Sequence, residues 1–138
     1  MKTVDLDGNL INWKIGGQVV TGKDTRHRSQ LHLKARGILK ELYPALQIIE
    51  EVSIKLKRYQ RASLDFYISK IYTVVEVHGE QHYKFNTFYH ASIQDFINQK
   101  KRDNDLKEWC DINNITYVEL PFNEGEEEWK KRITQPND

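Results

Sequence analysis

The sequence predicts a single α/β (α+β) domain whose elements run hairpin, helix, three strands, helix, strand and helix. Three observations support this fold class. The chain has 138 residues, a common size for one domain and too short for two substantial cores. Segments with alternating apolar residues lie between segments with helical apolar spacing. β-branched and aromatic residues dominate the middle of the chain, as expected of buried strands.

The first segment predicts a small hairpin over residues 4–20. Apolar residues flank the turn-forming Asp7-Gly8-Asn9, and Gly16-Gly17 ends the pattern. Residues 21–28 are polar and predict a linker. We therefore expect an N-terminal hairpin extension over residues 1–22 and one main domain over 23–138.

The first helix is expected to begin after Ser29, a residue type that caps helix N-termini, and to end at Tyr43-Pro44. Its apolar residues recur at helical spacing: Leu31, Ala35, Ile38, Leu39 and Leu42. Three strands are expected next, over residues 46–58, 63–69 and 71–78. A tight turn at Ser69-Lys70 is expected to join the second strand to the third.

Residues 79–90 predict a loop rich in aromatic side chains, and residues 91–113 predict a long helix. The inward face of that helix is expected to carry Ile93, Phe96, Ile97, Leu106 and Trp109. A last strand is expected over 115–120, ended by Pro121, and a short helix over 124–133 with Trp129 and Ile133 on its apolar face.

Composition excludes several classes of protein. Hydrophobic residues make up 38% of the chain and charged residues 30%, as in globular proteins with a modest core. No run of about 18 apolar residues predicts a membrane span, and the N-terminus lacks the apolar stretch of a signal peptide. Cys110 is the single cysteine, so no internal disulfide forms and a cytosolic location is expected.

The formal net charge of +1 conceals an uneven distribution. Residues 23–61 hold ten basic and four acidic residues, whereas residues 62–98 hold two basic and four acidic ones. A basic block of this kind suits contact with phosphates, although a solvated helix face would have the same composition.

The acidic middle segment suggests a metal site. Asp65 and Glu76 each interrupt an apolar strand, and a buried carboxylate is costly without a partner. If the two strands form a hairpin about Ser69-Lys70, Glu76 lies within reach of Asp65, and His78 leaves the same face as Glu76. One Mg²⁺ would relieve the repulsion between the carboxylates. His78 or His82 would then act as base, acid or water-positioning group.

The same residues allow two other interpretations. Strand carboxylates commonly face solvent and bind nothing. A zinc site would draw on His78, His82, His90 and Cys110, but these residues show no Cys-x-x-Cys or helical His-x-x-x-His spacing. Zinc is therefore less favoured, and Cys110 is interpreted as a partly buried small residue.

A longer pattern combines these residues with the second helix. It comprises Leu64-Asp65-Phe66, then Val75-Glu76-Val77-His78-Gly79-Glu80-Gln81-His82-Tyr83, then Arg102-Asp103-x-x-x-Lys107-x-Trp109-Cys110. This pattern resembles the PD-(D/E)XK nuclease superfamily, and within it the branch of very-short-patch repair endonucleases and phage EDxHD homing endonucleases. The resemblance covers residues 29–130 and implies a restriction-endonuclease-like αβββαβ core with a mixed central sheet.

The resemblance also implies roles for individual residues. Asp65 matches the metal-binding aspartate, Glu76 the second acidic position, and His78 stands where the superfamily has a lysine. Asp103 matches the aspartate of the later helix, with Asp105 as a fallback. The general base stays open between His78 and His82. The remaining acidic position is taken provisionally as Glu51, with three alternatives: Glu41, Glu50 and His32.

The function implied is that of a Mg²⁺-dependent endodeoxyribonuclease, with Mn²⁺ as a possible substitute, encoded by a phage or mobile element and acting in the host cytosol. Basic residues would grip the DNA backbone without reading its sequence. These are Arg28, Lys34, Arg36, Lys57, Arg58, Arg61 and Lys84.

Base recognition would need the N-terminal hairpin, the 79–90 loop, or a separate recognition domain or partner. In that loop Phe85, Tyr89 and His90 would stack on bases or simply cover the sheet edge. Three alternative functions are an inactive nucleic-acid-binding module, a resolvase or restriction-type nuclease, and a protein-interaction domain. Oligomeric state and cleavage specificity stay open.

Overall fold

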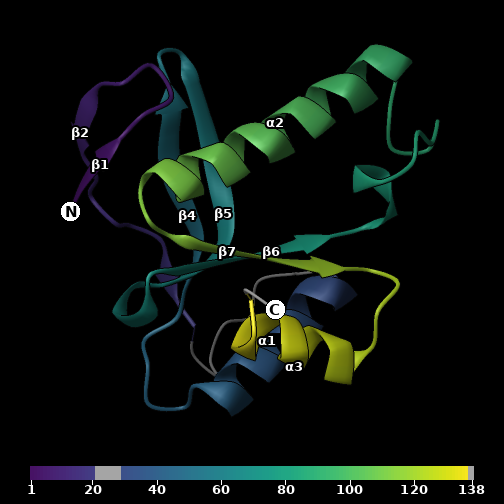
Figure 1. Ribbon diagram of the computed structural model, residues 1–138. Coiled ribbons are helices and arrows are strands. Elements are labelled where there is room, and N and C mark those ends of the chain that lie inside the picture. Colours follow the sequence, from purple (N-terminus) through teal and green to yellow (C-terminus); the bar gives the residue numbers. More distant parts are fainter. Residues whose placement is uncertain (21–28, 137–138) are drawn as a thin grey trace.

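A computed structural model provides the structure and describes residues 1–20 and 29–136 (Figure 1). A five-stranded mixed sheet forms its centre, with α2 on one face and α1 and α3 on the other. This confirms the predicted α/β class and the αβββαβ order. The elements are β1 (Lys2–Val4), β2 (Leu10–Asn12), β3 (Gln18–Val19), α1 (Gln30–Leu42), β4 (Ile49–Lys57), β5 (Gln60–Ile68), β6 (Thr73–His78), α2 (Ile93–Ile112), β7 (Thr116–Pro121) and α3 (Glu126–Thr134).

The sheet has the order β3-β4-β5-β6-β7, and only β6 and β7 of the neighbouring pairs run parallel. In the β5–β6 pair Phe66 lies opposite Val75 and Tyr67 opposite Val74, so the predicted hairpin is present. Its connection is longer than a Ser69-Lys70 turn. A short 3₁₀ helix spans Ser69–Ile71 and is followed by Tyr72 in the left-handed conformation.

The β4–β5 hairpin bends at Glu51 and Asp65. Val52 and Leu64 pack into the core on the α2 side, whereas Phe66 packs into the core on the α1 and α3 side. Leu64 and Phe66 are two residues apart and would share a face in a regular strand. The change of face coincides with Glu51, whose φ of 56° lies in the left-handed region. Asp65 therefore sits at a bend of the sheet.

The N-terminal hairpin is shorter than the predicted 4–20 segment. It comprises β1 and β2, while Gln18 and Val19 form β3 at the edge of the central sheet. Trp13 is only 6% exposed, and its ring lies 5.0 Å from that of Tyr67 and 5.4 Å from that of Trp109. The segment after the hairpin thus contributes to the core on the α2 side.

The first and last helices follow the predicted patterns. The Ser29 hydroxyl accepts from the backbone N–H of His32 at 3.1 Å and caps α1. On α3, Trp129 and Ile133 are buried as expected. The linker predicted over residues 21–28 lies outside the described residues.

The predicted inward face of α2 is wrong in its first half. Ile93 is 61% exposed and Ile97 51% exposed, while Leu106, Trp109 and Cys110 are buried. Figure 1 shows the reason, since the N-terminal half of α2 extends past the edge of the sheet. Apolar spacing predicted the helix correctly but could not predict where the sheet ends.

Candidate active site

A cavity of about 400 Å³ opens between β5, β6 and α2. Five of the six residues predicted to be catalytic line it: Asp65, Glu76, His78, His82 and Asp103. They come from three segments of the chain, and their side chains converge because Asp65 and Glu76 lie on the α2 side of the sheet. The sixth residue, Glu51, does not line this cavity.

Asp65 and Glu76 are in direct contact. The backbone N–H of Asp65 donates to Glu76 Oε1 at 3.2 Å, and the N–H of Val77 donates to Asp65 Oδ2 at 2.8 Å. Burial, and then the charge of Asp65, raise the pKa of the Glu76 carboxyl well above its usual range. Burial beside Asp65 therefore disfavours a charged Glu76 compared with an exposed glutamate.

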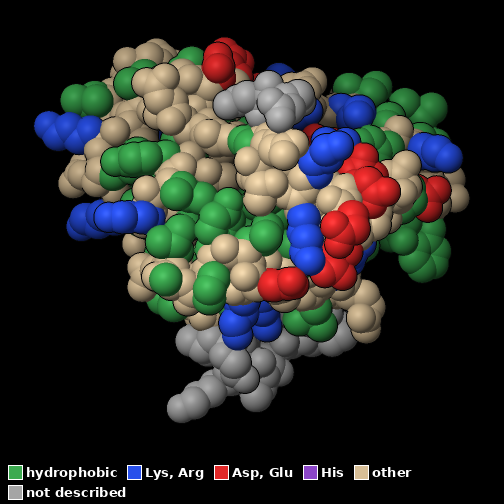
Figure 2. All heavy atoms as spheres, turned by 60° about the horizontal axis from the view of Figure 1, so that its bottom comes forward, with side chains coloured by type: hydrophobic (Ala, Val, Ile, Leu, Met, Phe, Trp, Pro, Cys, Tyr) green, Lys and Arg blue, Asp and Glu red, His purple; other side chains and the backbone are tan. Residues whose placement is uncertain are grey.

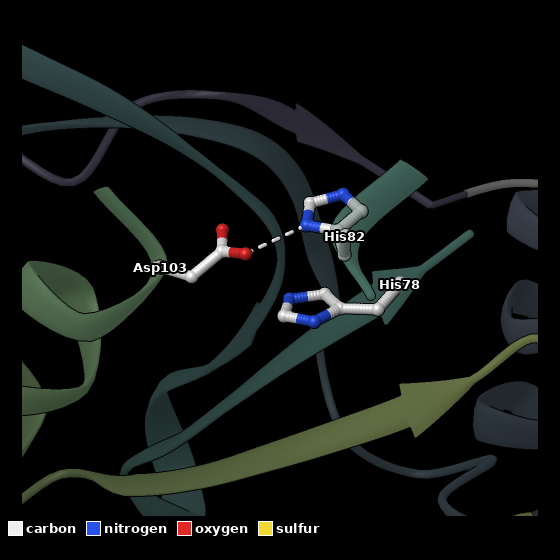
Figure 3. A group of neighbouring side chains, drawn as sticks. All are labelled: His78, His82 and Asp103. Atoms are coloured by element: carbon white, nitrogen blue, oxygen red, sulfur yellow. Dashed lines mark hydrogen bonds and ion pairs between the residues drawn. The ribbon is translucent and has the colours of Figure 1, made fainter. Parts of the chain in front are cut away.

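A second group of potential ligands lies beside this pair (Figure 3). His78, His82 and Asp103 each offer one ligand atom, and these atoms lie within 4.8 Å of one another. His82 Nδ1 is 2.8 Å from Asp103 Oδ2, and the two imidazole rings stack with centroids 4.1 Å apart. The three residues are close enough to hold a metal ion. Two imidazoles and a carboxylate suit several divalent metals, so geometry alone leaves its identity open.

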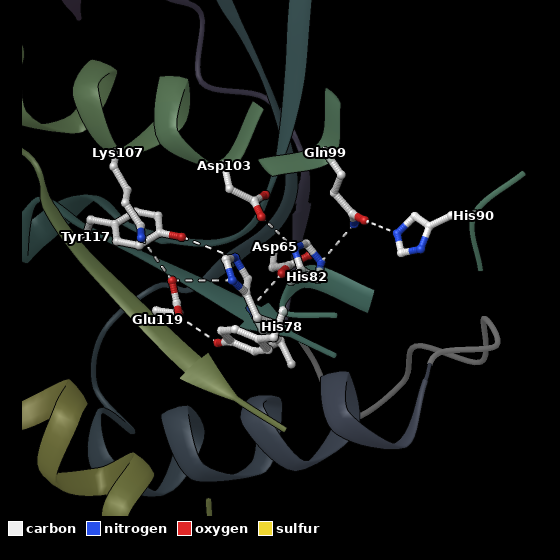
Figure 4. A network of polar contacts seen from close by, with 11 residues as sticks. Asp65, His78, His82, His90, Gln99, Asp103, Lys107, Tyr117 and Glu119 are labelled. Atoms are coloured by element: carbon white, nitrogen blue, oxygen red, sulfur yellow. Dashed lines mark hydrogen bonds and ion pairs between the residues drawn. The ribbon is translucent and has the colours of Figure 1, made fainter. Parts of the chain in front are cut away.

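His78 is held on both sides of its ring (Figure 4). Nδ1 lies 3.3 Å from Glu119 Oε1, and Nε2 lies 3.2 Å from the Tyr117 hydroxyl. Burial, and then the neighbouring His82, lower the pKa of His78, so the neutral ring is favoured at neutral pH. With both nitrogens engaged, His78 is fixed in orientation.

Glu119 is a site residue that the sequence reasoning missed. It accepts from the Tyr83 hydroxyl at 2.6 Å and lies 3.3 Å from Lys107 Nζ. Burial raises the pKa of Glu119, but the Tyr83 hydrogen bond and the charges of His78 and Lys107 outweigh it and lower the pKa overall. The signal was present, because Glu119 interrupts an apolar strand as Glu76 does, and the two face each other in register across β6 and β7.

Gln99 was also missed. Its Nε2 lies 3.4 Å from His82 Nε2, and its Oε1 lies 2.9 Å from His90 Nε2. Asp103, His82, Gln99 and His90 thus form one chain of polar contacts (Figure 4). The signal was a spacing of four, since Gln99, Asp103 and Lys107 follow one another on the same face of α2.

The candidates for the remaining acidic position lie elsewhere. Glu50 is fully buried and contacts His32 Nε2 at 2.8 Å and Arg36 Nη2 at 2.7 Å, on the α1 face of the sheet. Glu41 pairs with Lys130 on α3. Glu51 is exposed at the bend of β4, where its backbone is left-handed, and it is not among the residues that line the cavity. The fallback Asp105 also lies outside the cavity lining, 3.6 Å from Lys57 Nζ.

The predicted DNA-binding residues fall into two groups. Lys34 and Arg36 lie on the α1 face, where Lys34 Nζ sits 4.0 Å from the Trp129 ring centroid and Arg36 pairs with Glu50. Figure 2 shows that this α1 and α3 face carries acidic and basic side chains side by side, with ion pairs such as Arg132–Glu124. It is therefore not a uniformly basic surface.

The other group lies on the cavity side. Arg61 lines the cavity itself, and Lys57 and Arg58 continue along the β4–β5 hairpin. Lys84 is exposed in the loop after β6, and Arg28 lies outside the described residues. Arg102, which the sequence reasoning did not select as a DNA contact, also lines the cavity.

The aromatic loop has two parts. Phe85 stacks on His90 at 5.9 Å and meets Phe96 edge-on, so these rings cover the first half of α2. Phe88 and Tyr89 are 85% and 54% exposed. Cys110 is fully buried in the core and does not belong to the group of neighbouring ligand atoms formed by His78, His82 and Asp103, so it does not support the predicted zinc alternative.

Comparison with known proteins gives two partial matches. The chain is 39% identical over 59 residues to uncharacterized protein 307L of Invertebrate iridescent virus 6, covering 43% of this chain and 30% of the relative. It is 38% identical over 48 residues to uncharacterized protein 033L of Invertebrate iridescent virus 3, covering 35% of this chain and 25% of that relative. The matches thus span less than a third of either relative. No family model and no solved structure matches.

Within the described residues, no helix combines the length and apolar character that a bilayer crossing requires.

Proposed function

We propose that this chain is a metal-dependent endonuclease that hydrolyses DNA phosphodiester bonds. The observation that carries the proposal is the meeting of two pairs in one cavity: Asp65 with Glu76, and His82 with Asp103. Metal-assisted hydrolysis needs carboxylates that bind a cation and a nearby group, such as a histidine, that accepts a proton. The matches to proteins of two iridescent viruses fit a viral or mobile-element origin.

The carboxylate pair fits a divalent cation. Glu76 is buried beside Asp65, and their mutual repulsion is the condition that a bound cation relieves. Asp65 and Glu76 would hold Mg²⁺ or Mn²⁺. When bound, such an ion neutralises charge on the phosphate and lowers the pKa of a water.

His82 is the better candidate for the general base. Asp103 faces its Nδ1 at 2.8 Å, which favours the tautomer with hydrogen on Nδ1 and leaves the lone pair on Nε2. Among the described residues, that nitrogen has only the 3.4 Å contact with Gln99. His78, by contrast, has both nitrogens engaged, so we assign it the task of shaping the cavity.

Basic side chains at the cavity would position the substrate. Arg61 and Arg102 line the cavity from β5 and α2, on either side of the acids. Guanidinium groups bind phosphate oxygens in a bidentate manner, which suits them to the DNA backbone next to the bond that is cut.

The test is a cleavage assay with purified protein on supercoiled plasmid, linear duplex and branched DNA, with Mg²⁺ or Mn²⁺. We expect metal-dependent nicking that Asp65→Ala abolishes while DNA binding stays within about twofold. Asp111→Ala, which removes an exposed carboxylate from the far end of α2, is the matched control and should cleave normally.

Full cleavage by Asp65→Ala would refute the site. DNA binding by the wild type without cleavage in either metal would instead favour an inactive binding module.

A further inference from the structure

The turn between β4 and β5 carries an unusual residue. Lys57 pairs with Gln60, so Arg58 and Tyr59 alone form the connection. Tyr59 has a φ of 64° and is 91% exposed. Glycine or asparagine occupies left-handed turn positions at the least cost, whereas a bulky side chain there is disfavoured. A large aromatic ring held in solvent in a disfavoured conformation marks a surface built for contact.

The turn at Arg58 and Tyr59, called here the β4–β5 tip, is anchored by hydrogen bonds to the N-terminal hairpin. The backbone N–H of Arg58 donates to Asp7 Oδ2 at 2.8 Å, and the N–H of Leu6 donates to the Leu56 carbonyl at 2.7 Å. Leu56 itself is fully buried. The N-terminal hairpin thus supports β4, and the tip projects from a packed base.

Basic side chains connect the tip to the cavity. Arg58 lies at the turn with its guanidinium 5.0 Å from the Tyr59 ring centroid, and Lys55 pairs across the strands with Arg61. Arg61 lines the cavity that holds Asp65. Lys55 on β4, Arg61 on β5 and Arg58 in the turn thus place basic side chains between the candidate active site and the turn, and Figure 1 shows β4 and β5 rising together to that turn.

The distance from the tip to Asp65 corresponds to a short length of duplex DNA. Tyr59 precedes Asp65 by six positions, and at about 3.3 Å per strand residue the tip lies about 20 Å from the acid. Along B-form DNA, with about 3.4 Å per step, this is about six base pairs. The major groove of such a duplex admits a two-stranded β ribbon.

We propose that the β4–β5 tip enters a groove of duplex DNA, with Arg58 and Tyr59 contacting it about six base pairs from the bond that is cut. The inference rests on the proposed nuclease function for the position of the cut. It adds a recognition element on the main domain, which would give the enzyme contacts beyond the scissile phosphate.

The chain offers a matched pair of variants. Tyr72 is also a left-handed tyrosine, with a φ of 46° and 56% exposure, at the turn at the opposite end of β5. Tyr59→Gly and Tyr72→Gly each remove an exposed ring and relieve the same backbone conformation, so both should fold with undiminished thermal stability. Only Tyr59→Gly should weaken binding to a duplex in Ca²⁺, by roughly tenfold, the size of one good groove contact.

A photocrosslinking residue placed at position 59 or 72 locates the contact. Crosslinks from 59 should map about six base pairs from the nick, and 72 should give none. Unchanged affinity for Tyr59→Gly, or crosslinks from 59 that map beside the nick, would overturn the inference even if cleavage is normal. Weakened binding by Tyr59→Gly in a protein that never cleaves would support the groove contact and overturn the nuclease instead.

Discussion

The backbone N–H of Asp65 donates to the side chain of Glu76 at 3.2 Å, although in a regular sheet it would bond to the neighbouring strand. The bend explains this contact. Glu51, which would lie opposite Asp65, adopts a left-handed conformation, and the ladder between β4 and β5 skips this pair. The freed N–H then fixes the carboxyl of Glu76. A local defect in one strand pair thus holds the two acids against each other.

Replacement of Glu76 by glutamine should stabilise the metal-free protein at neutral and alkaline pH. The pKa of Glu76 is raised in the folded state by burial and then by Asp65. Its contribution to stability is therefore complete below the ordinary value of 4.5 and is lost as pH rises toward the raised pKa. The glutamine of Glu76→Gln has no proton to lose, so its melting temperature at about pH 8 should exceed that of wild type. The expected rise is about 4 °C for each kcal/mol gained in the free energy of unfolding.

The same thermal scans test the cation. Mn²⁺ should raise the melting temperature of wild type by mass action and leave Glu76→Gln nearly unchanged. Glu108→Gln, on the exposed side of α2, serves as the control and should follow wild type throughout. An equal loss of stability for Glu76→Gln at acid and alkaline pH would show that the carboxyl has a packing role only.

Replacement of Asp103 by asparagine should slow the chemical step. The carboxylate lies 2.8 Å from His82 Nδ1 and favours the tautomer that leaves Nε2 as proton acceptor. An amide of the same shape loses the charge that supports protonated His82, so kcat should fall by about 10²-fold to 10⁴-fold. Single-turnover cleavage measures this, with KM expected within about threefold of wild type. A large rise in KM with kcat intact would assign Asp103 to substrate binding.

Local sequence pattern was enough to predict both the order of elements and the acid pair. Asp65 and Glu76 interrupt apolar strands joined by a short connection, so local pattern and register brought them together. Glu119 obeys the same rule, but its register partner Glu76 lies 43 positions earlier in the chain, from 119 back to 76, and the pairing of strands so far apart cannot be predicted from local pattern.

Two other features depended on tertiary structure. Ile93 and Ile97 match an inward face, yet α2 extends past the sheet there. Arg36 belongs to the basic block, but the sheet places fully buried Glu50 beneath it. Charge counts cannot separate a cation that faces solvent from one that neutralises a buried acid.

Arg36→Met should destabilise the fold without altering the cavity. Glu50 is fully buried, with Arg36 Nη2 at 2.7 Å and His32 Nε2 at 2.8 Å. Removing one partner of a buried ion pair costs about 3–5 kcal/mol, and the contact with His32 favours the lower end. Urea unfolding measures the loss, with Lys40→Met on the exposed face of α1 as control. A change below about 1 kcal/mol would contradict a structural role for the pair.

Cys110 should resist alkylation in the folded protein. Burial, and then the charge of Glu76, raise the pKa of its thiol to about 12, so almost no thiolate exists at ordinary pH. Iodoacetamide at about pH 8 should modify it only after urea is added, which mass spectrometry detects. The raised pKa also predicts that stability falls as pH climbs above 9.0, the ordinary value, toward about 12. Rapid labelling of native protein would contradict the packing of α2 on the sheet.

The salt dependence of DNA binding should separate the two groups of basic residues. Each phosphate contact contributes about 0.9 to the slope of log affinity against log salt. Arg61 and Arg102 line the cavity, so Arg61→Ala and Arg102→Ala should each lower the slope by about 1. Lys34 already donates to the Glu124 carbonyl at 3.1 Å on the opposite face, so Lys34→Ala should leave the slope unchanged. If Lys34→Ala lowers the slope and the two arginine variants do not, DNA binds the α1 face and the cavity is not its site.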